Sequence, residues 1–277
     1  MIYLSLTTWS LHRNLGPLHW TRWDELKGEH FLDIQDQPET ISLLELPREL
    51  AAKGYSALEI GHFHIRDTSD DYLQKLRHAF ESAGIPFYTL LADYGDISSS
   101  DEARRSADIE WVKQWIDIAS KAGAERVRVI AGDTDASDTA ALQRSADALR
   151  ILCDYAASRN VRVITENFRP LSYTADNCLS LLESCGDRLG LTSDFGNFKG
   201  DDKFQELAKI VPHSESIHAK AITSAEGFPN VAEFTQCMEV VKKSGYQGPI
   251  TIVYDGPNDM WAGIERVKVL VKPYLTV

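Results

Sequence analysis

The sequence predicts an α/β protein, a single-domain (β/α)8 TIM barrel, from three observations. Eight short apolar runs alternate with eight longer segments of helical periodicity. The 277 residues suit one barrel of about 250 residues with some extension. No segment rich in Pro, Gly or Ser divides the chain, so residues 1–277 are predicted to form one domain.

The elements follow in order along the chain. The predicted strands are 2–8, 57–61, 86–91, 126–131, 161–166, 189–194, 216–221 and 250–255. The predicted helices are 41–53, 70–83, 101–122, 138–159, 175–185, 202–211, 231–244 and 259–270. Thr40, Ser69 and Ser100 stand at helix N-cap positions, and glycines 54, 84, 123 and 245 follow helix ends. A doubly wound open sheet is the alternative, but residues 8–12 lack its glycine-rich turn.

One connection is unusually long. Residues 10–39 separate the first strand from the first helix and contain His12, His19, Trp20, Trp23 and His30. Loops of this length without regular structure are uncommon and often functional. In a barrel this loop lies at the C-terminal face, so it is interpreted either as an active-site flap or as a packed cover.

Composition and charge exclude several classes of partner. With 29 Lys and Arg against 41 Asp and Glu, the formal charge is −12, which argues against a nucleic-acid partner. No apolar run approaches the ~18 residues of a membrane span, and the N-terminus lacks a signal-peptide pattern. The four cysteines form no CxxC pair, so a cytoplasmic location is predicted.

The alternation of side chains along the strands predicts a metal site. If the most apolar positions face the helices, then Glu166, Asp194 and His218 point inward near the C-terminal ends of three consecutive strands. A buried carboxylate is costly unless it is paired or bound to metal. Two carboxylates and an imidazole suit Mn, Mg, Co or Zn. The alternative is a salt-bridged polar core, with cationic partners Arg128, Arg162 and Lys220.

At these residues the chain resembles the xylose-isomerase-like TIM-barrel superfamily of sugar isomerases and epimerases. The resemblance spans the chain through the motifs ELPRELAAKGYSALEIGHFH, ITENF, LTSDFGNF, IHAK and GYQGPITIVYDG. It implies a divalent metal ion held by Glu166, Asp194 and His218. The family's fourth ligand, a Glu on the eighth strand, corresponds to Val253 here, and Asp255 is the nearest carboxylate. Asn197 stands where the family often has His.

The resemblance implies proton transfer next to a carbonyl group, and hence a role in carbohydrate metabolism. The candidate catalytic residues are Glu166, His218, Lys220 and Asp255. The candidate substrate-binding residues are Trp9, His12, Glu59, His62, His64, Arg169 and Asn197, and Trp20, Trp23 and Trp261 are further candidates for stacking on a sugar. Glu59 lies deeper and is also expected to pair with Arg128. Loss of the eighth-strand Glu favours a one-base isomerase over a two-base epimerase.

The partner is predicted to be a neutral carbohydrate. The loops that follow the seventh and eighth strands, ITSAEGFPN and DGPNDMW, contain no Lys or Arg to bind a phosphate. A lyase and an accessory barrel subunit with an incomplete metal site remain alternatives. An apurinic-site endonuclease ranks last because of the −12 charge and Asn197. Relatives often form dimers or tetramers, so the resemblance also implies a homo-oligomer.

Overall fold

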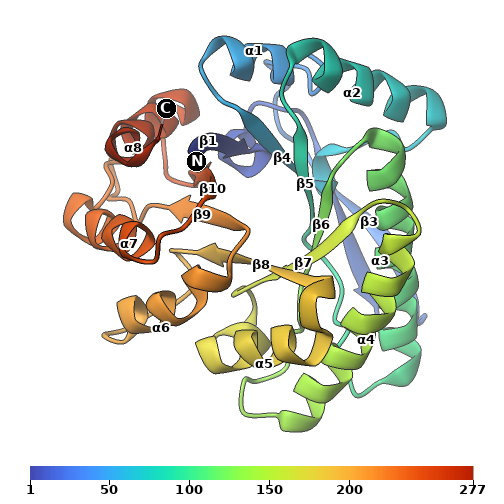
Figure 1. Ribbon diagram of the computed structural model, residues 1–277. Helices are drawn as coiled ribbons and strands as arrows, with labels where there is room; N and C mark the ends of the chain where they lie inside the picture. The colour runs from blue at the N-terminus through green and yellow to red at the C-terminus, as the bar shows by residue number, and fades with distance from the viewer. Residues whose placement is uncertain (277) are drawn as a thin grey trace.

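The computed structural model describes residues 1–276 and contains a closed barrel of eight parallel strands (Figure 1). Around the barrel the order is β1-β10-β9-β8-β7-β6-β5-β4, so strands that follow one another in the chain are neighbours. Their bounds are β1 Ile2–Thr7, β4 Ala57–Gly61, β5 Phe87–Ala92, β6 Arg126–Val129, β7 Arg162–Glu166, β8 Leu189–Asp194, β9 Ser216–Lys220 and β10 Gly248–Val253. The predicted (β/α)8 TIM barrel is confirmed.

Helices surround the barrel and cover the apolar outer faces of its strands (Figure 1). Their bounds are α1 Leu46–Ala52, α2 Asp70–Ala83, α3 Glu102–Ala122, α4 Thr139–Ala157, α5 Ala175–Cys185, α6 Lys203–Ile210, α7 Val231–Lys243 and α8 Met260–Val271. Among residues 1–276, no helix combines the length and hydropathy required to cross a membrane.

Two of the three predicted helix starts are wrong. Ser69 caps α2 as predicted, with its side chain accepting a hydrogen bond from Tyr72 N. Asp101, not Ser100, caps α3, because the helix begins one residue later and a carboxylate there also interacts favourably with the helix dipole. Thr40 lies well before α1, whose start is set instead by Pro47 in its first turn.

The interior of the barrel is polar in the predicted alternating pattern. Glu59 on β4 accepts hydrogen bonds from Ser216 on β9 and Thr251 on β10, across the barrel axis. Their neighbours in sequence, such as Leu58 and Ile217, are fully buried in the apolar core. Inward polar and outward apolar side chains therefore follow the period of two along each strand.

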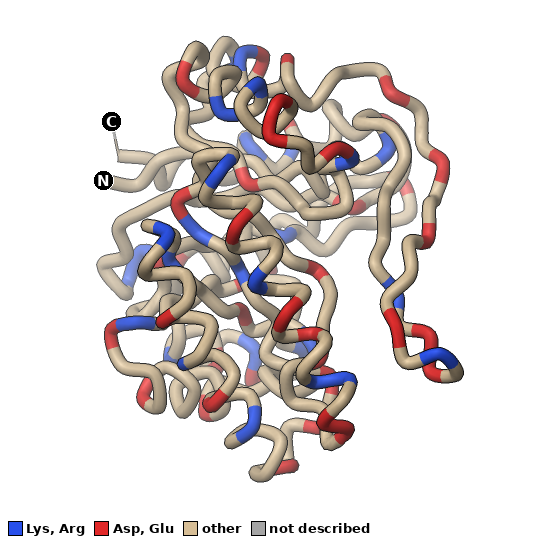
Figure 2. Tube along the Cα trace, turned by 90° about the vertical axis from the view of Figure 1, so that its right-hand side faces the viewer, with Lys and Arg blue, Asp and Glu red and all other residues tan. Residues whose placement is uncertain are grey.

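Segment 10–39 contains regular structure that the sequence interpretation missed. Strands β2 (Leu18–Asp24) and β3 (Glu29–Gln35) form an antiparallel hairpin with Trp20 opposite Asp33 and Trp23 opposite His30. Figure 2 shows this hairpin projecting from the barrel as a separate arm. Most of β3 is exposed to solvent, so its sequence lacks the alternation that a half-buried strand displays.

Candidate active site

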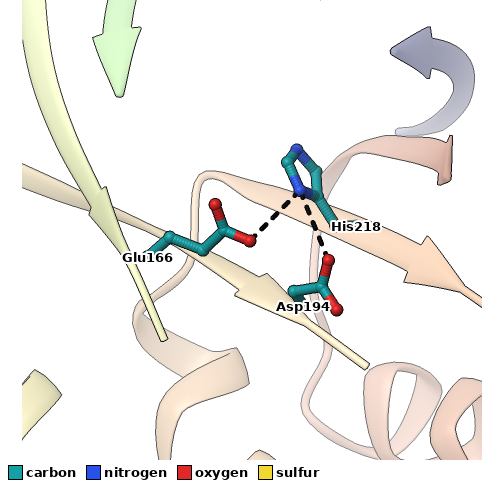
Figure 3. A group of neighbouring side chains, drawn as sticks. All are labelled: Glu166, Asp194 and His218. Atoms are coloured by element: carbon teal, nitrogen blue, oxygen red, sulfur yellow. Dashed lines mark ion pairs between the residues drawn. The ribbon is translucent and has the colours of Figure 1, made fainter. Parts of the chain in front are cut away.

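The three predicted metal ligands meet at the C-terminal face of the barrel (Figure 3). Glu166 ends β7, Asp194 ends β8 and His218 lies in β9, so three neighbouring strands bring them to one point. His218 Nδ1 lies 3.4 Å from Glu166 Oε1 and 3.6 Å from Asp194 Oδ2. One donor atom from each residue lies within 4.8 Å of the other two, and all three residues are buried.

A fourth residue sets the orientation of the histidine. Glu59 Oε2 lies 2.6 Å from His218 Nε2, and its Oε1 accepts hydrogen bonds from Ser216 Oγ and Thr251 Oγ1 at 3.0 and 3.1 Å. The contact on Nε2 leaves Nδ1 directed at the carboxylates of Glu166 and Asp194. A carboxylate behind a histidine in this way fixes the ring and its tautomer in metal sites.

The charge balance at this point calls for a cation. Burial alone lowers the pKa of His218, but the carboxylates of Glu59 and Glu166 outweigh burial and raise this pKa well above its ordinary value. Three carboxylates, including that of Asp194, surround one imidazole. A divalent cation held by these residues would satisfy the same demand in place of a proton on the imidazole. The residues present therefore fit a metal ion.

The residue at the position of the family's fourth metal ligand is apolar. Val253 lines the cavity beside the three candidate ligands and offers no donor atom. Asp255, the nearest carboxylate, pairs with Lys220, its Oδ2 lying 2.7 Å from Nζ. Glu166, Asp194 and His218 are therefore the residues that would hold a metal ion.

Glu166 is held from two sides. Arg128 Nε lies 3.1 Å from Glu166 Oε2, and Asn197 Nδ2 donates a hydrogen bond of 3.2 Å to Oε1. Arg128 also pairs with Asp93. The predicted pairing of Arg128 with Glu59 is wrong, because Glu59 turns toward His218 on the opposite side of the barrel.

Lys220 and Arg162, the other two cations of the predicted salt-bridged core, lie in different parts of the barrel. Lys220 lies at the site, where burial lowers its pKa but the carboxylates of Asp194 and Asp255 outweigh burial and raise it. Lys220 is therefore a stable ammonium group. Arg162 stands at the other end of its strand and pairs with Glu215. Two of the three cations of the alternative interpretation thus lie beside the candidate ligands, Arg128 at Glu166 and Lys220 near Asp194, and only Arg162 does not.

A cavity of about 280 Å³ opens above the three ligands. Of the predicted substrate-binding residues, Trp9, Arg169 and Asn197 line it, and Lys220 and Asp255 complete its wall. Trp20, a candidate for stacking on a sugar, lines it as well, so the structure brings together all four candidate catalytic residues and four of the candidate substrate contacts. Trp261 lies elsewhere, on α8, with the ammonium group of Lys53 over its ring.

The other predicted substrate contacts lie behind the cavity wall. His62 and His64, two of the candidate substrate-binding residues, are only 1% exposed. His62 Nδ1 accepts a hydrogen bond from Asp93 N, and His64 Nδ1 lies 2.9 Å from Thr8 Oγ1. Burial lowers the pKa of His62 to about 4 and that of His64 well below its ordinary value. Both are neutral core residues.

His12 and Glu59 are also set back from the cavity. His12 stacks on the ring of Trp9 at a centroid distance of 4.2 Å, and its Nδ1 lies 2.7 Å from Trp9 O. Glu59 is fully buried beneath His218. Both side chains orient residues that face the cavity, so we assign them positioning roles in place of substrate contact.

Several residues of the cavity wall were not predicted. Asp93 follows β5 directly, Arg128 lies in β6 and Phe168 follows β7. A polar residue at the end of the third barrel strand is the same signal that identified Glu166. Trp20 reaches the cavity from the hairpin and packs against Phe63 at 4.3 Å between centroids, so segment 10–39 contributes a side chain to the cavity wall.

Comparison with solved structures shows a shared fold at low sequence identity. An L-ribulose 3-epimerase matches with a TM-score of 0.71 at 16% identity, over 99% of this chain and 94% of that one. The probable 3-DHS dehydratase of petrobactin synthesis from Bacillus anthracis gives 0.70 at 19%, over 97% and 98%. A xylose isomerase-like TIM barrel protein from Mycobacterium smegmatis, solved in complex with magnesium, gives 0.66 at 14%, over 98% and 95%.

A search of curated protein sequences gives no significant match. The family model described as xylose isomerase-like TIM barrel matches residues 47–268. This range is most of the chain and includes all three candidate metal ligands. The resemblance predicted from the sequence motifs is confirmed, and the chain belongs to the xylose isomerase-like TIM barrel family.

Proposed function

We propose that this protein is a metal-dependent isomerase of the sugar isomerase and epimerase type. The observation that supports this best is the convergence of Glu166, Asp194 and His218 in a cavity at the C-terminal face, where barrel enzymes have their active sites. These side chains would hold Mn, Mg, Co or Zn. When bound, the cation would supply Lewis-acid polarisation of substrate carbonyl and hydroxyl oxygens.

Glu166 is the proposed base. It removes a proton from the hydroxyl-bearing carbon next to the carbonyl and returns it to the carbonyl carbon, while the proton of that hydroxyl passes to the carbonyl oxygen, the net change of a 1,2-isomerisation. Val253 is apolar where the family has a second carboxylate, so the eighth barrel strand offers no base beside the three candidate ligands. The arrangement therefore favours one-base isomerisation over epimerisation with a base on each face.

Lys220 is the proposed oxyanion stabiliser. Its raised pKa keeps the ammonium group charged, and the bond to Asp255 holds that group in the cavity wall. A fixed positive charge of this kind stabilises negative charge that develops on a substrate oxygen.

The proposed substrate is a neutral sugar, polyol or sugar derivative. Each cation of the wall already faces a carboxylate: Lys220 faces Asp255, Arg128 faces Glu166 and Asp93, and Arg169 lies 3.7 Å from Asp133. Aromatic rings of Trp9 and Trp20 offer stacking surfaces. A small carbohydrate partner, a homo-oligomer and a cytoplasmic location, without nucleic acid or membrane, remain predictions.

A lyase is the second candidate. The same proton abstraction by Glu166 becomes an elimination if the neighbouring hydroxyl leaves as water, and Lys220 could donate the required proton. The specific observation in its favour is the single base beside one ammonium group. An accessory, non-catalytic subunit is the third candidate. Such a subunit would not catalyse exchange of a substrate proton with solvent.

Solvent exchange tests the proposal. The protein, loaded with Mn²⁺, is incubated in D₂O with a panel of free aldoses and ketoses, and NMR follows deuterium at the carbon next to the carbonyl. We expect incorporation together with an isomerised product. Glu166→Gln should slow exchange by roughly 10² to 10⁴-fold, the contribution of a positioned base, and should weaken Mn²⁺ binding in calorimetry.

The matched control is Glu183→Gln, which changes an exposed glutamate on α5. It should leave exchange and Mn²⁺ affinity unchanged. Loss of water from the sugar would identify the lyase. Mn²⁺ binding with no exchange on any sugar would refute the catalytic proposal and favour the accessory subunit.

A further inference from the structure

We propose that the substrate is larger than one sugar, and that a second cavity binds its attached group, a second neutral sugar ring. This inference rests on the proposed function, since the reacting sugar occupies the catalytic cavity. The second cavity measures about 440 Å³ and lies between the β2–β3 hairpin and the C-terminal ends of β5 and β6. Arg169 lines both cavities.

The two cavities also adjoin each other along two segments besides Arg169. Trp20 and Asp93 line the catalytic cavity, whereas Arg22 and Tyr94 line the second. The catalytic cavity alone, about 280 Å³, lies at the lower limit of the roughly 300–1,000 Å³ typical of ligand sites. The second cavity more than doubles the space.

Aromatic and paired charged side chains give the second cavity the character of a sugar site. Trp23, Phe31 and Tyr94 line it, and sugar rings pack against such surfaces.

Two ion pairs line the same cavity and serve as hydrogen-bonding groups. Arg22 Nε lies 3.2 Å from Asp33 Oδ2, and Arg104 Nη1 lies 3.1 Å from Glu25 Oε1. Each pair offers donors and acceptors to hydroxyl groups while its charges balance, which favours a neutral polyhydroxyl ligand over an anion.

Arg169, at the junction, carries an unused donor. Its Nε–H is buried and has no hydrogen-bond partner among residues 1–276. Its backbone has φ of +73°, a conformation that costs a non-glycine residue free energy and is concentrated at functional sites. A buried donor without a partner is also uncommon. An acceptor oxygen of the substrate, between its two rings, would satisfy it.

Binding measurements test this inference independently of turnover. Calorimetry compares cellobiose, maltose, lactose, sucrose and trehalose with their component glucose, galactose and fructose. At least one disaccharide should bind roughly tenfold more tightly than either component, the effect of one added ring and hydrogen bond. The double variant Arg22→Ala/Asp33→Ala leaves no unpaired charge. It should lower the ratio of disaccharide affinity to monosaccharide affinity by roughly tenfold.

The matched control is Arg188→Ala/Asp154→Ala, an exposed Arg–Asp pair on another face with an N–O distance of 2.8 Å. It should leave the ratio unchanged. Monosaccharides that bind as well as every disaccharide would overturn the inference, as would a ratio that survives in Arg22→Ala/Asp33→Ala. Absence of deuterium exchange would instead count against the proposed function, because the affinity ratio does not depend on turnover.

Discussion

Val253 is the residue at which this site departs most clearly from the pattern of its family. Its side chain lines the cavity beside Glu166, Asp194 and His218, where a carboxylate would complete a four-ligand set. Under the proposed function, valine at this position leaves the site without a fourth ligand and without a second base. This one residue would therefore favour one-base isomerisation over epimerisation.

Placing a glutamate at position 253 tests whether this position lies beside a bound metal ion. Val253→Glu should raise the affinity for Mn²⁺ by roughly tenfold or more, because a fourth anionic oxygen joins the site. The measurement is calorimetric titration with Mn²⁺. Val253→Gln is the matched control, with the same size but no charge, and should give a smaller gain. Equal affinities for the wild-type protein and Val253→Glu would show that a metal ion does not sit beside position 253.

At the scale of elements, the β2–β3 hairpin is the distinctive addition to the barrel. It precedes the residues matched by the family model, and it supplies Trp20 to the catalytic cavity. Two polar contacts join its far end to α3: His30 Nε2 lies 2.9 Å from Asp108 Oδ1, and Glu25 Oε1 lies 3.1 Å from Arg104 Nη1. Asp108 is fully buried, so the contact with His30 is the less exposed of the two.

Loss of the contact between His30 and Asp108 should loosen the hairpin. His30→Ala leaves the buried Asp108 carboxylate with one partner fewer, which costs about 1–3 kcal/mol. We expect faster trypsin cleavage after Lys27, an exposed residue in the turn of the hairpin. The control is His78→Ala, an exposed histidine on α2. Unchanged cleavage at Lys27 in His30→Ala would show that Trp20 and its aromatic neighbours hold the hairpin without His30.

At the scale of the whole molecule, buried histidines make global stability depend on pH. The unfolded chain titrates its histidines near 6.5, whereas burial lowers the pKa of folded His62 to about 4. Below pH 6.5 the unfolded state therefore binds a proton that the folded state excludes. The stability that His62 contributes is complete above pH 6.5 and is lost as pH falls toward 4.

Denaturant unfolding at two pH values measures this effect. His62 alone should make the wild-type protein roughly 2 kcal/mol less stable at pH 5 than at pH 7.5. His62→Asn keeps an acceptor for Asp93 N but cannot be protonated, so its loss of stability between these pH values should be smaller by that amount. His78→Asn, at an exposed position, is the control. The same pH dependence in the wild type and His62→Asn would contradict the assignment.

Much of the fold and the centre of the site could be predicted because they depend on local periodicity. The alternation of apolar and polar residues located the strands, and strand ends located Glu166, Asp194 and His218. His62 and His64, candidate substrate-binding residues in the sequence, lie behind the cavity wall for a tertiary reason. Aromatic rings from distant segments, including Trp111 and Trp115, enclose His62, and no local pattern reveals such neighbours.

The sequence by itself determined the barrel, the family and the three residues that converge at its mouth. Only the tertiary structure decided which groups those residues contact. Glu59 and His218 are 159 positions apart, and closure of the barrel brings them within 2.6 Å. The hairpin and the second cavity likewise depend on packing between separate segments. Periodicity specifies the face of an element on which a side chain lies, whereas its partners depend on how complete elements pack.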